Sequence, residues 1–344
     1  MNNMHYIGFD IHKKMISFCE KMMDGSIVNQ GVIRATRKSL NEWLEERKKP
    51  WVGAMEATLF TGWIYDFLLP HAEELKVAHP AMLKAITAAK KKNDAADAEK
   101  IADLLRCNLL PECYMAPEEH RNLRRILRYR NLLVREASKM KTKTATLLME
   151  VGAEYNKRRL HGRKYFQELL DNLDYVPRSV LNLLQMSHDS VSFFDTLQKT
   201  LVRALRNDPQ IRKRVELLMS IRGIGEVTAL TWVLEIGDVH RFGRIRQVVS
   251  YCGLCSAQKE SAGKESRGPL SKQRNKHLQT VLIEAAKLAP QWNPQLAVIH
   301  EREIGKGNRN RATLAVARKL VAYMMAVDKN QKKFIPQEVL EKAA

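Results

Sequence analysis

Short apolar runs alternate with polar segments over the first hundred residues, which is the pattern of strands in a sheet. Three such runs occupy residues 5–10, 15–19 and 51–56. The first run ends at Asp10 and the third at Glu56, and a run of good helix formers begins at Asp94. The order of strand, hairpin, strand and helix predicts an α/β domain over residues 1–116.

The apolar positions then change to a spacing of three and four residues, which is typical of amphipathic helices. Two stretches have this spacing, at 118–153 and 177–207, and many basic residues fill the polar positions of the first. We expect the two helices to pair as an antiparallel coiled coil within residues 117–208. The segment between them is strongly basic, and we expect Arg158 and Arg159 to contact RNA or DNA; a solvated charged loop is the alternative.

Four carboxylates are candidates for one metal site. Asp10 and Glu56 each follow a strand, and the edge of a sheet gathers residues that are distant in sequence. Asp94 and Asp97 are three residues apart near the start of a helix, so they share one face. Oxygen ligands suit Mg²⁺ or Mn²⁺, and two such ions about 3.5–4 Å apart assist phosphoryl transfer. Each acid also has an ordinary explanation. Asp94 would be a helix N-cap and Asp97 a favourable first-turn residue, while Asp10 would be a turn residue and Glu56 a solvated residue after a strand.

Two glycines, Gly223 and Gly225, lie between predicted helices. A Gly-Ile-Gly turn lets backbone N–H groups approach a phosphate beside the positive end of the following helix. The segment 221–227 therefore resembles the helix-hairpin-helix modules that hold the DNA backbone. A purely structural turn is the alternative, because glycine is common in turns.

The segment Ser256–Asn275 is predicted to be a basic loop. Its lysines and arginines are suited to stabilising charge that develops on phosphate. A serine hydroxyl is a poor nucleophile unless neighbouring groups orient it or lower the cost of forming an alkoxide. Four serines compete for that role on chemical grounds, and phosphate binding without catalysis is the default. They are Ser256, Ser261, Ser266 and Ser271.

Motifs in both halves of the chain carry a resemblance to a known family. The first half contains Gly8–Lys13, Glu56–Thr58 and Asn93–Ala98, and the second contains Ile221–Gly225, Tyr251–Leu254, Glu260–Gly263 and Leu270–Lys272. They resemble the motifs of the insertion-sequence transposases called family one-ten, over nearly the whole chain. The resemblance implies an RNase H-like (RuvC-like) domain over residues 1–116, a mainly helical, serine-bearing transposase domain over 209–334, and a tail over 335–344.

The resemblance also implies an activity. Family members are DNA recombinases, and a structured non-coding RNA from the element guides them to target and donor DNA. The motif in the second half places the nucleophile at Ser261, and the acidic motifs imply Mg²⁺, as two ions per site, on the four carboxylates. We expect attack of Ser261 on a DNA phosphodiester, giving a transient phosphoserine linkage. We expect phosphate contacts from Gly223, Gly225, Lys259, Gly263, Lys264, Arg267, Ser271 and Lys272.

The acids and Ser261 lie about 150 residues apart in the sequence, on either side of the predicted coiled coil. We therefore expect a composite active site, with the acids of one protomer facing the serine of another in a homodimer or homotetramer. Four positions depart from the family pattern: Leu59, Asn93, Arg274 and Gln279. Arg274 and Gln279 follow Lys272, so they concern the shape of the backbone around it.

Two other functions stay open. A junction-resolving or single-strand nuclease would use water as its nucleophile and would not need Ser261. A non-catalytic RNA-binding scaffold would need neither the serine nor the four acids.

The charge of the chain favours a polyanionic partner. Its formal net charge is +20. Residues 1–116 hold 16 basic and 15 acidic residues, whereas residues 117–344 hold 42 and 23. The basic excess therefore lies outside the domain that carries the acids, and such a field suits nucleic acid.

Other features bound the location of the protein. The sequence has no apolar run of about 18–20 residues and no signal peptide pattern, so we expect neither a membrane span nor secretion. Five cysteines, an odd number, favour a reducing compartment such as the bacterial cytoplasm. Cys252 and Cys255 have the spacing of half a zinc site, but packing is the better interpretation, because no second matching pair occurs.

Overall fold

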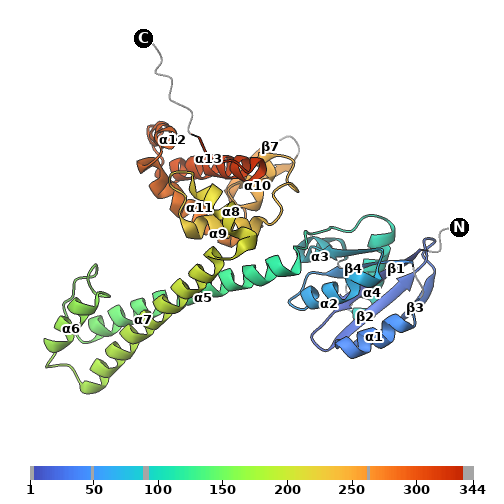
Figure 1. Ribbon diagram of the computed structural model, residues 1–344, viewed down its shortest axis with the longest axis horizontal. Helices are drawn as coiled ribbons and strands as arrows, with labels where there is room; N and C mark the ends of the chain where they lie inside the picture. Colours follow the sequence, from blue (N-terminus) through green and yellow to red (C-terminus); the bar gives the residue numbers. More distant parts are fainter. Residues whose placement is uncertain (1–3, 48–49, 88–92, 262–263, 336–344) are drawn as a thin grey trace, which may run out of the picture. The chain divides into compact units, whose positions relative to one another are not determined.

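The computed structural model describes residues 4–47, 50–87, 93–261 and 264–335. The chain divides into two compact units, Met1–Glu118 and Glu119–Ala344. The first is an α/β domain and the second is mainly helical, which confirms the coarse fold expected from the sequence (Figure 1). The finer division at residue 208 stays a prediction. Gly263 and residues 336–344 of the predicted tail lie outside the described residues.

The first unit is built on a sheet of five strands: β1 (His5–Ile11), β2 (Met15–Lys21), β3 (Ile27–Arg34), β4 (Trp51–Glu56) and β5 (Glu74–Ala78). Their order across the sheet is β3-β2-β1-β4-β5. The three strands β1, β2 and β3 pair antiparallel, while β1, β4 and β5 pair parallel. This mixed sheet is compatible with the RNase H-like fold that the sequence predicts.

Helices cover both faces of this sheet: α1 (Arg37–Glu45), α2 (Thr61–Leu68), the short 3-10 helix η1 (Leu69–His71), α3 (Pro80–Thr87) and α4 (Asp94–Arg106). Successive side chains of a strand point to opposite faces. Ile7, Phe9 and Ile11 of β1 therefore join one core with residues of α1 and α2. The other face carries Gly8 and Asp10, and α4 packs on it.

The second unit contains helices α5 (Glu118–Glu150), α6 (Arg163–Asp171), α7 (Arg178–Arg206), α8 (Pro209–Met219), α9 (Glu226–Ile236), α10 (Ile245–Tyr251), α11 (Lys276–Leu288), the 3-10 helix η2 (Ala289–Gln291), α12 (Pro294–Ile304) and α13 (Arg309–Asn330). Its central helix is α9, whose residues from Thr228 to Ile236 are all buried. A helix that is apolar on every side has to be enclosed by others. Residues of α8, α11 and α13 belong to the same core cluster.

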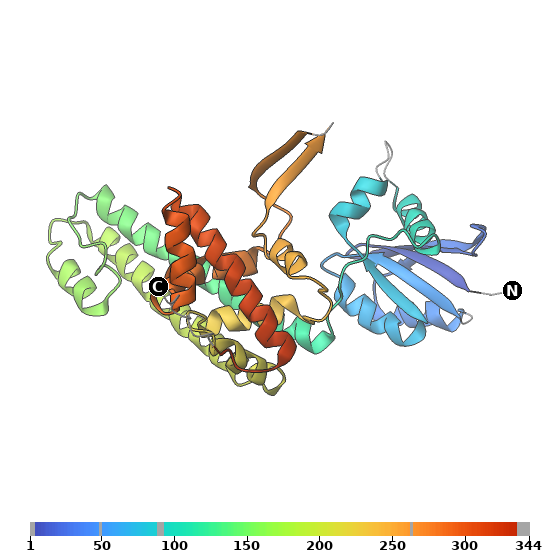
Figure 2. The ribbon, with the colours of Figure 1, turned by 90° about the horizontal axis from the view of Figure 1, so that it is seen from above.

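The two long helices occupy the stretches that the sequence predicts, although α5 ends at Glu150 rather than near residue 153. They run antiparallel: Arg130, early in α5, donates a hydrogen bond to Gln198, late in α7 (3.0 Å). Leu148, late in α5, shares a core cluster with Leu184, early in α7. Figures 1 and 2 show the two helices beside each other. Their packing as a coiled coil stays a prediction.

The segment that we expected to be a basic loop is mostly a two-stranded antiparallel ribbon, which corrects that expectation. Its strands are β6 (Ser256–Ser261) and β7 (Lys264–Leu270), and the ribbon projects from the helices of its unit (Figure 2). The strands are dominated by polar residues. They therefore lack the apolar alternation by which a half-buried strand is recognised in a sequence.

Candidate active site

Two parallel strands bring Asp10 and Glu56 to the same edge of the sheet. Phe9 of β1 is the register partner of Met55 of β4, so the next residues, Asp10 and Glu56, occupy matching positions. The side chains of matching residues on adjacent strands point to the same face. Asp10 is buried and Glu56 is half-buried. The sequence prediction that the sheet gathers these two acids agrees with this register.

A close backbone contact places α4 on that face. A Cβ atom at Gly8 would lie 2.1 Å from the carbonyl oxygen of Ala98 and 2.5 Å from the nitrogen of Ala102, so only glycine allows the helix to come this near. The helix begins at Asp94, and its cap is Asn93, whose side chain accepts a hydrogen bond from Ala95 N (3.1 Å). The alternative that Asp94 is the cap is therefore wrong.

Asp10, His12 and Asp94 form a compact group. Nε2 of His12 lies 3.1 Å from Oδ2 of Asp10 and 3.5 Å from Oδ1 of Asp94. One possible ligand atom from each of the three lies within 4.8 Å of the others. Asp97 is close enough for its charge to act on Asp10, and its Oδ1 lies 3.3 Å from Nζ of Lys100. Glu56, at the end of the neighbouring strand, is not a member of the three-residue group.

The ionisation of Asp10 reflects this crowding. Burial raises the pKa of its carboxyl above the ordinary value, and the nearby carboxylates of Asp94 and Asp97 raise it further. His12 acts in the opposite direction through its charge and hydrogen bond. The protein thus holds a carboxylate in a position where its negative charge is unfavourable unless a cation is close.

His12 was not among the site residues expected from the sequence, where it is only part of the motif Gly8–Lys13. Its position two residues after Asp10 was the available signal, because side chains at this spacing share a face of an extended segment. An exposed histidine after a strand is common, so spacing alone did not single it out.

Ser261 is the last residue of β6, and its register partner is Lys264. It therefore stands at the end of the described part of β6. Ser266, another of the competing serines, lies on β7 as the partner of Lys259. The four acids belong to the first compact unit, whereas Ser261 belongs to the second.

Arg274 and Gln279, two residues that depart from the family pattern, form hydrogen bonds to backbone carbonyl groups beside this ribbon. Nη1 of Arg274 donates to the carbonyl oxygen of Ser271 (2.8 Å), and Nε2 of Gln279 donates to that of Gly253 (2.6 Å). The hydroxyl of Ser271 accepts from Gln273 N (3.2 Å). The segment around Lys272 is thus held by hydrogen bonds to its own backbone. Leu59, the departure in the first unit, is 96% exposed.

A buried polar network fixes the residue at which this segment enters α11. Glu235 of α9 is 1% exposed and receives two hydrogen bonds from Arg128 of α5 and one from Asn275, each 2.8 Å long. Asn275 caps α11 by accepting from His277 N and Leu278 N. Burial by itself would raise the pKa of Glu235, but Arg128 and Asn275 outweigh it and lower that pKa.

Glu235→Gln is expected to reduce the free energy of unfolding at pH 7 by about 1–3 kcal/mol, less than for a fully buried pair because Arg128 is half-exposed. In the wild type this stabilisation is present above the ordinary pKa of 4.5 and is lost as pH falls through the lowered pKa. Urea denaturation at pH 7 and in acid should show that the difference in free energy of unfolding between wild type and Glu235→Gln becomes smaller in acid. The exposed pair of Glu216 and Arg212 provides the control, Glu216→Gln, for which little change is expected. A difference in free energy of unfolding that does not change with pH would contradict this explanation.

The glycines of the turn before α9 have different roles. Gly223 has a φ of +98°, and a Cβ there would lie 2.6 Å from Cβ of Ala289, so this position requires glycine for structural reasons. Gly225 is the N-cap residue of α9, with a φ of −85°, and a Cβ there would meet open space. The turn does join two helices, as expected, but its identity as a helix-hairpin-helix module stays a prediction.

The basic segment between α5 and α6 contains Arg158 and Arg159, both exposed. Their backbone N–H groups donate to Oδ1 of Asn156 (3.0 and 3.3 Å). The guanidinium of Arg159 stacks over the ring of Tyr165, 4.6 Å from its centroid. Both side chains are therefore accessible to a partner, and their contact with nucleic acid stays a prediction.

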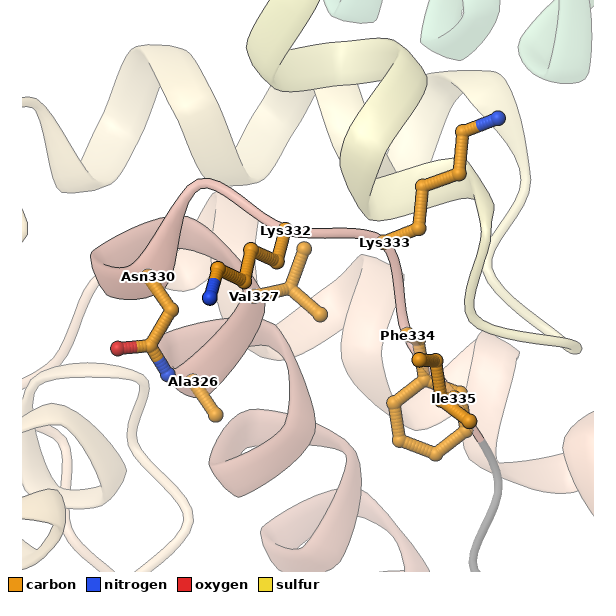
Figure 3. A pocket seen from close by; sticks show the side chains of 7 residues that line it. All are labelled: Ala326, Val327, Asn330, Lys332, Lys333, Phe334 and Ile335. Atoms are coloured by element: carbon orange, nitrogen blue, oxygen red, sulfur yellow. The ribbon is translucent and has the colours of Figure 1, made fainter.

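Other features of the molecule are separate from the predicted site. A cavity of about 510 Å³ lies at the end of α13, and its lining includes Val327, Lys332 and Phe334 but none of the predicted site residues (Figure 3). Cys252 is buried in the core, and burial raises the pKa of its thiol. Within the described ranges, each helix is too short or too polar to span a bilayer.

Comparison with known proteins identifies the family. A model of the DEDD transposases of IS110 elements matches residues 7–152, and a model described as the transposase IS116/IS110/IS902 family matches residues 215–301. The transposase for insertion sequence element IS1328 of Yersinia enterocolitica is 23% identical over 327 residues, which are 93% of this chain and 95% of that protein. The transposase for IS1111A of Coxiella burnetii is 27% identical over 208 residues, 57% of this chain and 54% of that protein. The resemblance carried by the sequence motifs is thereby confirmed, and the chain belongs to the IS110 family of insertion-sequence transposases.

Proposed function

We propose that this transposase cuts and rejoins DNA by metal-assisted attack of Ser261, with Asp10, Glu56, Asp94 and Asp97 as the metal ligands. DNA is the substrate that membership of the family implies. The observation that carries the proposal is the compact group of Asp10, His12 and Asp94 at the sheet edge where β4 also ends in Glu56. Such convergence of acids is the requirement for binding a divalent cation close to a phosphodiester.

The residues present fit Mg²⁺, with Mn²⁺ as the substitute. Carboxylate oxygens are the donors that both ions prefer, and the imidazole of His12 adds a nitrogen donor that transition metals accept. Burial penalises the charge of Asp10, and a cation beside it would remove that penalty. When bound, one or two such ions supply polarisation of the phosphate and stabilisation of charge on the attacking and leaving oxygens.

The proposed step conserves the number of phosphate ester bonds. The hydroxyl oxygen of Ser261 forms a bond to phosphorus and loses its proton to solvent, while one phosphorus–oxygen bond of the DNA breaks and the leaving oxygen takes up a proton. The resulting phosphoserine ester retains the reactivity of the bond that was broken, so a hydroxyl end of a second strand is able to displace serine. We assign Lys259, Arg267 and Lys272 to phosphate contacts that stabilise the developing charge.

We further propose that the active site combines two protomers of a homodimer or homotetramer. The acids and the serine lie in different compact units, and the long helices α5 and α7 offer an extended surface for assembly. A structured non-coding RNA is the proposed guide, because the excess of basic residues lies beyond residue 116 and suits a second polyanion besides DNA.

A mixing experiment tests this arrangement. Asp94→Ala and Ser261→Ala proteins are each expected to be inactive in strand exchange on element-end and target DNA with Mg²⁺ and the flanking RNA. In a freely exchanging dimer mixed in equal amounts, about a quarter of the composite sites should be complete, so about a quarter of the wild-type activity should return.

Each variant mixed with wild type serves as the control for subunit exchange. Absence of rescue, when tagged subunits demonstrably exchange, would show that the acids and the serine act within one protomer. Strand cleavage that persists in Ser261→Ala without any protein–DNA adduct would instead favour the water-using nuclease.

A further inference from the structure

A basic groove lies where α5, α7 and the start of α9 meet. It encloses about 300 Å³. Four cationic side chains line it, together with a single carboxylate, Glu226. The cations come from two helices: Arg130 from α5, and Lys199, Arg203 and Arg206 from α7.

The groove has more cationic side chains than carboxylates. Nε of Arg206 lies 3.3 Å from Oε1 of Glu226, so that cation offsets the only carboxylate. Among the described residues, Lys199 and Arg203 have no carboxylate oxygen within 4.0 Å, and both are exposed. The groove therefore retains cations that are available to an anion.

Arg130 strengthens this conclusion because it is half-buried and its hydrogen bonds go to neutral groups. Its Nε donates to Oε1 of Gln198 (3.0 Å) and its Nη1 donates to Oδ1 of Asn131 (3.1 Å). Burial lowers the pKa of its guanidinium. A partly desolvated cation without a counter-ion is stabilised by an anion that comes within reach.

The start of α9 adds backbone donors on the same side. The first N–H groups of a helix have no partner within the helix and carry a partial positive charge. Glu226 and Val227, which open α9, both line the groove. Beside them, the open space at the exposed Gly225, the N-cap residue of α9, leaves its backbone accessible.

We propose that this groove binds a backbone phosphate of nucleic acid, with Arg130, Lys199 and Arg203 as its cationic ligands and the Gly225 end of α9 as its backbone donor. The proposal deepens the proposed function, on which it rests, by locating a second contact region besides the ribbon. DNA and RNA share the phosphodiester chemistry that the groove would recognise.

The test measures binding without catalysis. Fluorescence anisotropy with a labelled duplex DNA and, separately, a labelled RNA hairpin is measured in EDTA over a series of salt concentrations. Lys199→Gln/Arg203→Gln is expected to weaken binding roughly tenfold and to reduce the slope of log K against log salt by about 1–2, since each phosphate contact on duplex DNA contributes about 0.9. Loss with one nucleic acid alone identifies it as the occupant, and loss with both supports a shared site.

The matched control removes the same charge from outside the groove. Arg178→Gln/Lys213→Gln changes two exposed cations, one at the opposite end of α7 and one on α8, and should leave the salt slope close to that of the wild type. Gly225→Ala should lower the unfolding temperature only slightly, because its Cβ meets open space and alanine is merely a poorer N-cap residue, and should weaken binding several-fold.

Two outcomes overturn the inference in different ways. If the wild type binds nucleic acid and the groove variant has the same affinity and salt slope as the control variant, the groove is not a phosphate site and the proposed function is unaffected. If the wild type binds neither DNA nor RNA, both the groove and the proposed function fail.

Discussion

Asp10→Asn is expected to reduce metal-dependent DNA cleavage by roughly 10³-fold or more, because losing a charged ligand removes several kcal/mol of transition-state stabilisation. The same change should leave the fold intact or slightly more stable. Asparagine keeps the shape of the side chain and removes a charge that burial and the carboxylates of Asp94 and Asp97 make unfavourable. Cleavage of element-end DNA in Mg²⁺, together with thermal unfolding in EDTA, measures both effects.

The control for Asp10 is Glu42→Gln, which removes an exposed carboxylate from α1 in the same unit. Its cleavage rate should match that of the wild type. A loss of cleavage in Asp10→Asn accompanied by a lower unfolding temperature would indicate damage to the fold instead of loss of a ligand. Retention of cleavage with an intact fold would remove Asp10 from the proposed metal site.

Ser261→Ala is expected to abolish the covalent protein–DNA adduct altogether, because the hydroxyl oxygen forms the only proposed bond between protein and DNA. Wild-type protein incubated with Mg²⁺, element-end DNA and the flanking RNA should yield an adduct that survives denaturation. DNA binding in EDTA should change little, since one neutral hydroxyl is lost and no phosphate-binding cation is removed.

Ser266→Ala is the matched control for Ser261, because Ser266 lies on the partner strand of the same ribbon. It should form the adduct at the wild-type level. Transfer of the adduct to Ser266, or its persistence in Ser261→Ala, would assign the nucleophile elsewhere among the competing serines. An adduct that forms without RNA would separate the chemical step from the proposed guide.

The elements that carry the four acids could be predicted from sequence because they follow local rules, while the metal site itself stays a prediction. Asp10 and Glu56 each end an apolar run, and Asp94 and Asp97 share the first turns of a helix whose residues favour helix formation. The contact that unites them was not predictable. It depends on Gly8 meeting the backbone of α4, and a glycine inside a strand does not indicate which element approaches it.

The second unit was harder to predict. The long helices have strong apolar periodicity and are found nearly as expected, whereas the polar ribbon of β6 and β7 lacks such a signal. The basic groove was not predictable for a different reason. The antiparallel pairing of the long helices was expected, but the pattern of apolar residues does not give the register that places Arg130 of α5 beside Gln198 and Arg203 of α7.

The contact at Gly8 has a consequence for how this protein can change in evolution. The spacing between the strand that carries Asp10 and the helix that carries Asp94 is set by backbone atoms meeting at one glycine. The buried side chains of α4, among them Ile101 and Leu105, pack on the sheet around this contact, so they are constrained together with residue 8. A single added methyl group at residue 8 would force apart the two elements that carry the proposed metal ligands.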